Sequence, residues 1–157
     1  MPPITTRNIS TGDLIKSAQG AVEIVVTPRC DLADDDKVTT IQLAECEDIA
    51  TEWTALQADL RGGDKKKVAA ATDKIKSWYQ HRNRFVLHFL PPMITDKGAK
   101  AGPWAVRFDR IRSVPKNENA VKDLHAHRFA SVTSEFLPSL VSRLGTFFSR
   151  IGAPDLS

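Results

Sequence analysis

The chain has 157 residues and a mass of 17.4 kDa, a length that fits one domain able to bury roughly 70% of its unfolded surface. Hydrophobic residues make up 41% and charged residues 26%, which excludes a wholly disordered or fibrous chain. The formal net charge is +3 and the pI about 9.0, which allows an anionic partner without requiring one, because a nucleic-acid surface also needs clustered charge.

The composition also bears on the compartment. No apolar run approaches the ~20 residues of a membrane span, and the first residues lack the basic and apolar regions of a secretory signal. Two cysteines, Cys30 and Cys46, are too few for a disulfide framework and are expected as reduced thiols. We therefore expect a cytoplasmic protein that does not act at a membrane.

The first part of the chain predicts three strands. After an arm over 1–11, a short strand is expected at 14–15 and a longer one over 21–27. Apolar side chains fall on both faces of the longer strand, as in the centre of a sheet, and Pro28 ends it because proline cannot donate to a neighbouring strand. A strand over 38–44 then returns as its hairpin partner.

The next stretch predicts an inserted helical hairpin over 47–80. The apolar period becomes helical from Cys46, and Gly62 and Gly63 separate two stripes, with Asp64 placed to cap the second helix. The first stripe consists of Ile49, Trp53, Leu56 and Leu60, and the second of Val68, Ala71, Ile75, Trp78 and Tyr79.

Two further strands are predicted by alternation in 84–90 and from Trp104 onward, joined by a flexible loop over 95–103. The simplest pairing is an antiparallel hairpin in which one face carries Phe and Trp side chains. On this interpretation the other face carries Arg107 beside His88.

The last segments predict a bulge and two helices. Ile111 is out of phase with the preceding alternation, which indicates a bulge or strand end near Arg110, and 115–127 has room for one or two helical turns. A C-terminal helix is expected over 134–151, ended by Gly152. Its expected buried stripe is Leu137, Leu140, Val141, Leu144, Phe148 and Ile151.

Together these elements predict a single α+β domain over 1–157. Its centre is expected to be a small curved antiparallel sheet or an SH3-like barrel, carrying the inserted hairpin at 47–80 and the C-terminal helix at 134–151. We find no internal repeat and no low-complexity segment.

Two resemblances rest on short segments. The order GDLI (12–15), AVEIVVTP (21–28), WAVRFDRIRSV (104–114) and SEFLPSLVSRL (134–144) resembles the layout of the MazF/PemK toxin family, an SH3-like barrel. VVTPRCD together with HRNRFVLHF is similar to a group of uncharacterised bacterial proteins that carry a VVSxxCDI-type segment. The toxin resemblance implies an arginine such as Arg29 on phosphate and a hydroxyl from Thr39 or Thr40. The helical insertion departs from that family's pattern.

One candidate catalytic group consists of Arg29, Cys30, Asp31 and His88. A cysteine beside an arginine is a candidate nucleophile, and His88 or His81 is a candidate base. The structural alternative is that Cys30 packs at the strand end while Asp31 caps the following turn.

A candidate nucleic-acid surface comes from arginines in segments expected to be neighbours. We call this set the basic rim: Arg82, Arg84, Arg107, Arg110 and Arg112. Tyr79 and Trp104 are candidate stacking platforms beside it. The alternative is that the arginines are scattered over a solvated face and the aromatic residues belong to the core.

No metal or cofactor is expected. The cysteines and histidines show neither CxxC nor HExxH spacing, and GGDKKK lacks the preceding strand and the GK[ST] ending of a phosphate loop. Three adjacent aspartates, at 34–36, read as a solvated loop more readily than as a Mg²⁺ site.

The leading hypothesis is an intracellular bacterial binding or regulatory module that uses the basic rim on RNA, DNA or a partner protein encoded nearby. The alternative is a metal-independent endoribonuclease of the toxin type. A third is an antitoxin-like or defence-associated accessory protein whose helices dock a partner. The sequence leaves the oligomeric state open.

Overall fold

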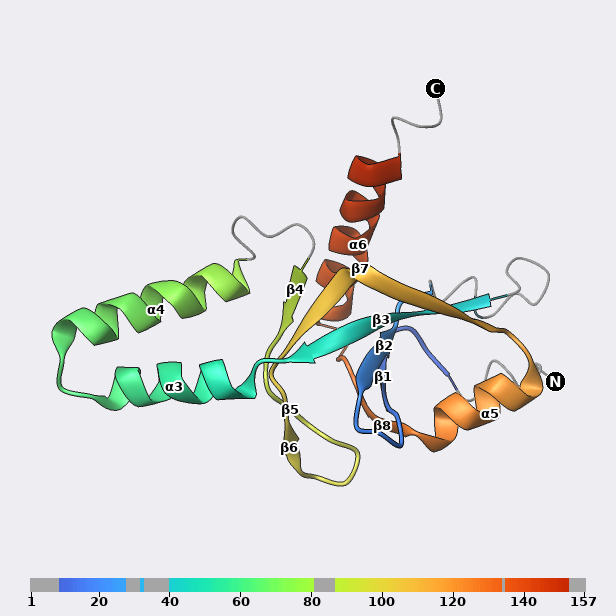
Figure 1. The fold of residues 1–157 in the computed structure, drawn as a ribbon, viewed down its shortest axis with the longest axis horizontal. Coiled ribbons are helices and arrows are strands. Elements are labelled where there is room, and N and C mark those ends of the chain that lie inside the picture. Colours follow the sequence, from blue (N-terminus) through green and yellow to red (C-terminus); the bar gives the residue numbers. More distant parts are fainter. Residues whose placement is uncertain (1–8, 28–31, 33–39, 81–86, 134, 153–157) are drawn as a thin grey trace.

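The computed structural model places one curved antiparallel sheet at the centre of the chain, with helices on both of its faces (Figure 1). The strands are β1 (Asp13–Lys16), β2 (Val22–Val25), β3 (Thr40–Asp48), β4 (Leu87–Leu90), β7 (Trp104–Pro115) and β8 (Arg128–Ser131). The structure describes residues 9–27, 32, 40–80, 87–133 and 135–152.

The strand order is β4-β7-β3-β2-β1-β8, and every neighbouring pair is antiparallel. The sheet curls into a half-barrel, so β4 and β8 remain as its two edges. The predicted α+β class with a small curved antiparallel sheet is therefore confirmed. β8 was not predicted, because its alternating segment RFAS is too short to stand out in the sequence.

The curvature is concentrated at a bulge in β7. Ala44 of β3 pairs with Ile111, but the next residue, Glu45, pairs with Arg107, which leaves 108–110 without partners in β3. Such bulges bend a strand and increase its twist. The bulge predicted near Arg110 is confirmed, and the strand continues beyond it to Pro115.

The inner face of the sheet is covered by α6 (Leu137–Gly152), whose Leu140, Leu144 and Phe147 are buried. They join a cluster of strand side chains that includes Leu14, Ile24, Leu90, Trp104, Val106 and Phe108. The predicted helix is confirmed, but its expected stripe was partly wrong, since Val141 is 39% exposed and Phe147 is buried instead. The side chains of Phe148 and Ile151 lie outside the described residues.

The outer face carries a second apolar cluster under α5 (Glu118–Ala126), which Asn117 caps by accepting from the Ala120 N–H at 2.9 Å. Val121 and Leu124 of α5 pack with the strand side chains Ile15, Val25, Ile41 and Leu43. Because β2 sends Ile24 to one cluster and Val25 to the other, it is buried on both faces, as its apolar sequence predicts.

The helical hairpin projects away from the sheet (Figure 1). It consists of α3 (Ala50–Arg61), which has no buried residue, and α4 (Lys65–Tyr79), and the Asp64 carboxylate accepts from the Lys66 N–H at 2.9 Å as predicted. β3 runs on to Asp48, so strand structure extends past the expected change of period at Cys46, and the non-helical Ile49 precedes α3.

An aromatic cluster attaches the hairpin to the sheet. The rings of Trp53 and Trp78 lie 5.8 and 5.5 Å from that of Phe89 in β4, and 6.2 Å from each other. Tyr79 meets the same ring edge-on at 5.0 Å. The hairpin is therefore fixed at its base while the rest of α3 remains accessible to solvent.

The segment expected as a flexible loop over 95–103 is instead part of a small hairpin. β5 (Met93–Ile94) pairs with β6 (Lys100–Ala101), and the turn uses Gly98 at a φ of +83°. A Cβ at Gly102 would lie 2.8 Å from Cζ3 of Trp104, so glycine is required there for the close approach to the indole.

We expect Leu140→Ala to lower the free energy of unfolding by about 2–5 kcal/mol, because it leaves a cavity between α6 and the sheet. Val141→Ala, one residue along on the exposed side, should change it by less than about 0.5 kcal/mol. Chemical denaturation followed by circular dichroism measures both values. Equal losses would contradict the placement of α6.

Candidate functional site

The register of β4 with β7 separates His88 from the arginines of the basic rim. His88 pairs with Val106, and Arg107 pairs with Leu87. Paired residues point to the same face and successive residues to opposite faces, so His88 faces α6 while Arg107 lies on the outer face. The expectation that Arg107 lies beside His88 was wrong.

His88 lies in an apolar environment. It is 3% exposed, its ring centroid lies 6.1 Å from that of Phe108, and it contributes to the wall of a small hollow of about 100 Å³ with Tyr79 and Phe136. The sheet lies between His88 and the described arginines of the basic rim, so an acid or base at this position is kept away from them. The described residues therefore do not assemble the combined site that the sequence suggested.

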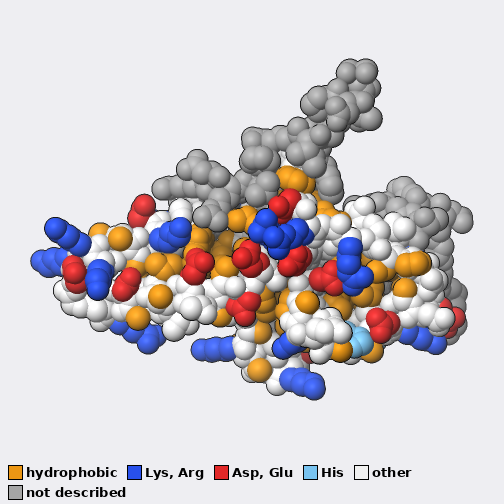
Figure 2. All heavy atoms as spheres, viewed as in Figure 1, with side chains coloured by type: hydrophobic (Ala, Val, Ile, Leu, Met, Phe, Trp, Pro, Cys, Tyr) orange, Lys and Arg blue, Asp and Glu red, His pale blue; other side chains and the backbone are white. Residues whose placement is uncertain are grey.

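The three described rim arginines form a charge ladder with carboxylates on the outer face, where Figure 2 shows acidic and basic side chains interspersed. Arg112 holds Glu23 through two hydrogen bonds of 2.6 and 2.8 Å, Arg110 lies 3.4 Å from Glu45, and Arg107 lies 3.3 Å from Glu47 and 2.7 Å from Asp109. The contacts run between β7 and β3, across β3 to Glu23 of β2, and along β7 to Asp109.

The contacts within the charge ladder shift the pKa values of its side chains. The hydrogen bond to Asp109 is the main cause that raises the pKa of Arg107, and the same bond lowers the pKa of the Asp109 carboxyl. Glu23 raises the pKa of Arg112. A phosphate that approached these arginines would compete with carboxylates already in place, which weakens the case for a nucleic-acid surface here.

Several sequence candidates lie outside the described residues. They are Arg29, Cys30 and Asp31 of the catalytic group, Arg82 and Arg84 of the basic rim, His81, Thr39 and the aspartates at 34–36. Within the described part of the chain, no group of three or more His, Cys, Asp and Glu side chains is arranged to hold a metal ion.

An apolar groove lies where the two edge strands end. We call it the seam groove: it has a volume of about 310 Å³ and is lined by residues 90–94, 131–133 and Phe136, none of them charged. Residues 90–94 continue from β4, and 131–133 connect β8 to α6. The hollow beside His88 shares Leu90, Pro91 and Phe136 with it, so the two are neighbours.

Large apolar side chains are exposed around the seam groove. Ile94 is 59% exposed, Phe136 46% and Tyr79 48%, and each lines one of the two hollows. Tyr79 was expected in a helix stripe and as a stacking platform beside the basic rim, whereas Ile94 and Phe136 carry no signal in the sequence that marks them. The diproline at 91–92 after a strand was an available signal for an edge, but nothing in the sequence places it beside Phe136.

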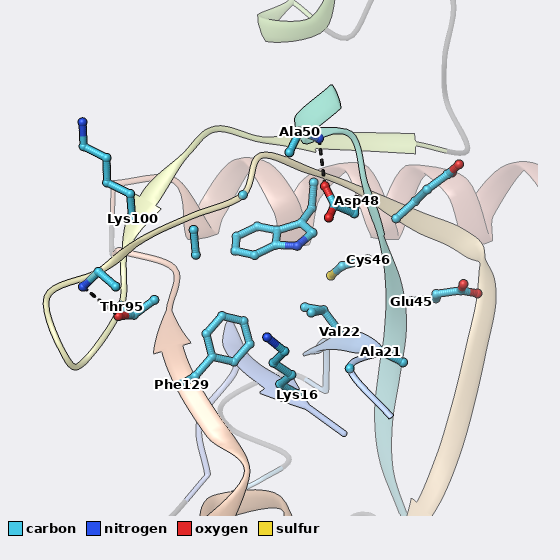
Figure 3. Close-up of a pocket in the computed structure, with 16 residues that line it drawn as sticks. Lys16, Ala21, Val22, Glu45, Cys46, Asp48, Ala50, Thr95, Lys100 and Phe129 are labelled. Carbon is cyan, nitrogen blue, oxygen red and sulfur yellow. Dashed lines mark hydrogen bonds between the residues drawn. The ribbon is translucent and has the colours of Figure 1, made fainter. Parts of the chain in front are cut away.

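A third hollow, of about 590 Å³, lies on the inner side at the end of β3, beside the β5–β6 hairpin (Figure 3). We call it the mouth pocket; its walls include Lys16, Val22, Cys46, Asp48, Trp104 and Phe129. The Cys46 thiol is 6% exposed and lies 3.9 Å from the Ala44 carbonyl oxygen. Burial, aided by Glu23 and Glu45, raises the pKa of Cys46, which favours the neutral thiol over the reactive thiolate.

No family model, curated protein or solved structure matches this chain. Among the described helices, none combines the length and the apolar character that crossing a bilayer requires.

The buried thiol leads to a prediction for alkaline pH. Above about pH 8.5 the unfolded chain ionises Cys46 while the folded chain keeps it protonated, so stability should fall with rising pH by about 1.4 kcal/mol per unit from this group. The measurement is the pH dependence of unfolding in a Cys30→Ser background, with Cys46→Ala subtracted. A difference that stays constant between pH 8 and 10 would show that the thiol ionises in the folded state as well.

Proposed function

We propose that this protein is a non-enzymatic binding module that captures an extended apolar segment of a partner protein in the seam groove. The observation that carries the proposal is that the exposed side chains of Ile94 and Phe136 line the uncharged seam groove, while exposed Tyr79 lines the neighbouring hollow that shares Phe136. Scattered single apolar residues are ordinary on a surface, but a group of them that rims a groove is typical of a recognition site.

The position between two sheet edges suits an extended segment. Edge strands offer backbone hydrogen bonds, and alternating pockets beside them select side chains, as in β-strand addition. Parts of both edges already have partners: the Leu87 carbonyl accepts from Arg143, and the Phe129 carbonyl accepts from the Asp96 N–H at 2.9 Å. Pro91 and Pro92 cannot donate, which limits uncontrolled pairing between copies and leaves side-chain burial as the main source of affinity.

The charge ladder is the reason to favour a protein partner over RNA or DNA. Its arginines face Glu23, Glu45, Glu47 and Asp109. The ribonuclease alternative also needs acid–base groups near phosphate-binding arginines, and His88 lies across the sheet from them. No described observation favours that reaction.

The test is a displayed library of short peptides selected on the wild-type protein, followed by affinity measurements with one synthetic peptide. We expect peptides with apolar residues at alternating positions, and Phe136→Asp or Ile94→Asp should weaken binding at least about tenfold through loss of apolar burial. Val141→Asp is the matched control, because it places the same charge on an exposed apolar position of α6 that does not line the groove.

The variants separate the outcomes. Loss of affinity confined to the two groove variants supports the proposal. Selected peptides that bind all three variants equally, or no selection at all, would overturn it. Thermal unfolding of each variant shows that an exposed substitution has not simply disrupted the fold.

A second experiment addresses RNA. We expect single-stranded RNA incubated without metal to remain intact and to bind weakly at physiological salt. The double change Glu45→Gln and Glu47→Gln should strengthen RNA binding because it removes the carboxylate from Arg110 and leaves Arg107 paired with Asp109 alone. Filter binding at several salt concentrations measures this. Cleavage by the unmodified protein would instead establish the enzyme.

A further inference from the structure

The mouth pocket combines an aromatic floor with apolar walls. Trp104 of β7 and Phe129 of β8 meet edge to face, with ring centroids 6.0 Å apart, and Val22 and Ala101 add aliphatic surface. Trp104 is 4% exposed, so most of its ring is covered, and the half-buried Phe129 that packs against it offers the aromatic surface of the pocket. A volume of about 590 Å³ falls within the usual range of small-molecule sites, roughly 300–1,000 Å³.

The carboxylates at this pocket have described hydrogen-bond or ion-pair partners, whereas the Lys16 ammonium does not. Glu45 and Glu47 are bound by Arg110 and Arg107, and the Asp48 carboxylate accepts from the Ala50 N–H at 2.8 Å. Figure 3 shows Glu45 pointing away from the hollow and Lys16 pointing into it beside Phe129. No described residue forms a hydrogen bond or ion pair with the Lys16 ammonium.

Cys46, the one thiol among the described lining residues, is buried and has a raised pKa, which disfavours a reactive thiolate in this pocket. The activity considered for the pocket is reversible binding at the Lys16 ammonium. An aromatic floor accepts a flat ring, and a cation at its edge accepts a carboxylate through a charge-assisted hydrogen bond.

We propose that the mouth pocket binds a small planar aromatic carboxylate, with the ring against Phe129 and the carboxylate on Lys16. This site is separate from the seam groove. The mouth pocket and the seam groove share no lining residue. The proposed ligand site therefore does not depend on the proposed partner segment.

The test is isothermal titration of the full chain with three probes of the same ring: indole-3-acetate, its neutral amide and tryptamine. We expect the anion to bind about tenfold more tightly than the amide, a difference typical of a hydrogen bond to a charged group. Lys16→Gln should abolish this difference. Lys100→Gln is the matched control, because Lys100 lines the same pocket but points away from it in Figure 3.

The other outcomes overturn the proposal. Equal affinity for the acid and the amide, tighter binding of tryptamine, or no binding of any probe at millimolar concentration would each exclude an anion site at Lys16. Retained selectivity in Lys16→Gln would place the site elsewhere. Phe136→Asp should leave the titration unchanged, so a failure of the seam groove and a failure of the mouth pocket are distinguishable.

Discussion

The pairing of β3 with β7 is the constraint on which the rest of this structure depends. It runs from Thr40 with Pro115 to Asp48 with Trp104, and the bulge within it bends the sheet. On the inner face this pairing brings Cys46 and Trp104 to the mouth pocket. On the outer face it sets the glutamates of β3 against the arginines of β7. Either surface would be lost if the two strands slipped by one residue, because every side chain would change face.

The sequence predicted most elements but not how they meet. Alternation predicted the strands, and Asp64 with the two glycines predicted the helical hairpin, because these signals are local. The faces of His88 and Arg107 were assigned wrongly because register depends on partners distant in the chain. The exposure of Val141 and the burial of Phe147, which the expected stripe did not include, have the same origin, since the rotation of a helix is fixed by what it packs against. The seam groove and the mouth pocket each bring together segments that are far apart in the sequence, so neither was predictable.

Both proposed sites follow from the incomplete closure of the half-barrel. A closed barrel would pair β4 with β8 and have no edges to protect. Here Arg143 and the backbone of Asp96 take up one carbonyl on each edge, and the proline pair removes donors from the segment after β4. The remaining gap is covered by apolar side chains on one side of the molecule. The β5–β6 hairpin forms part of the wall of the mouth pocket.

The edge strand β4 contributes both to the aromatic contacts that attach the helical hairpin and to the seam groove. Phe89 holds Trp53 and Trp78 on one face, and its neighbour Leu90 forms part of the seam groove on the other. A rotation of this short strand about its axis therefore moves both surfaces together. The helical hairpin is long and is attached at its base. A small rotation at Phe89 would therefore produce a large displacement at the far end of the hairpin.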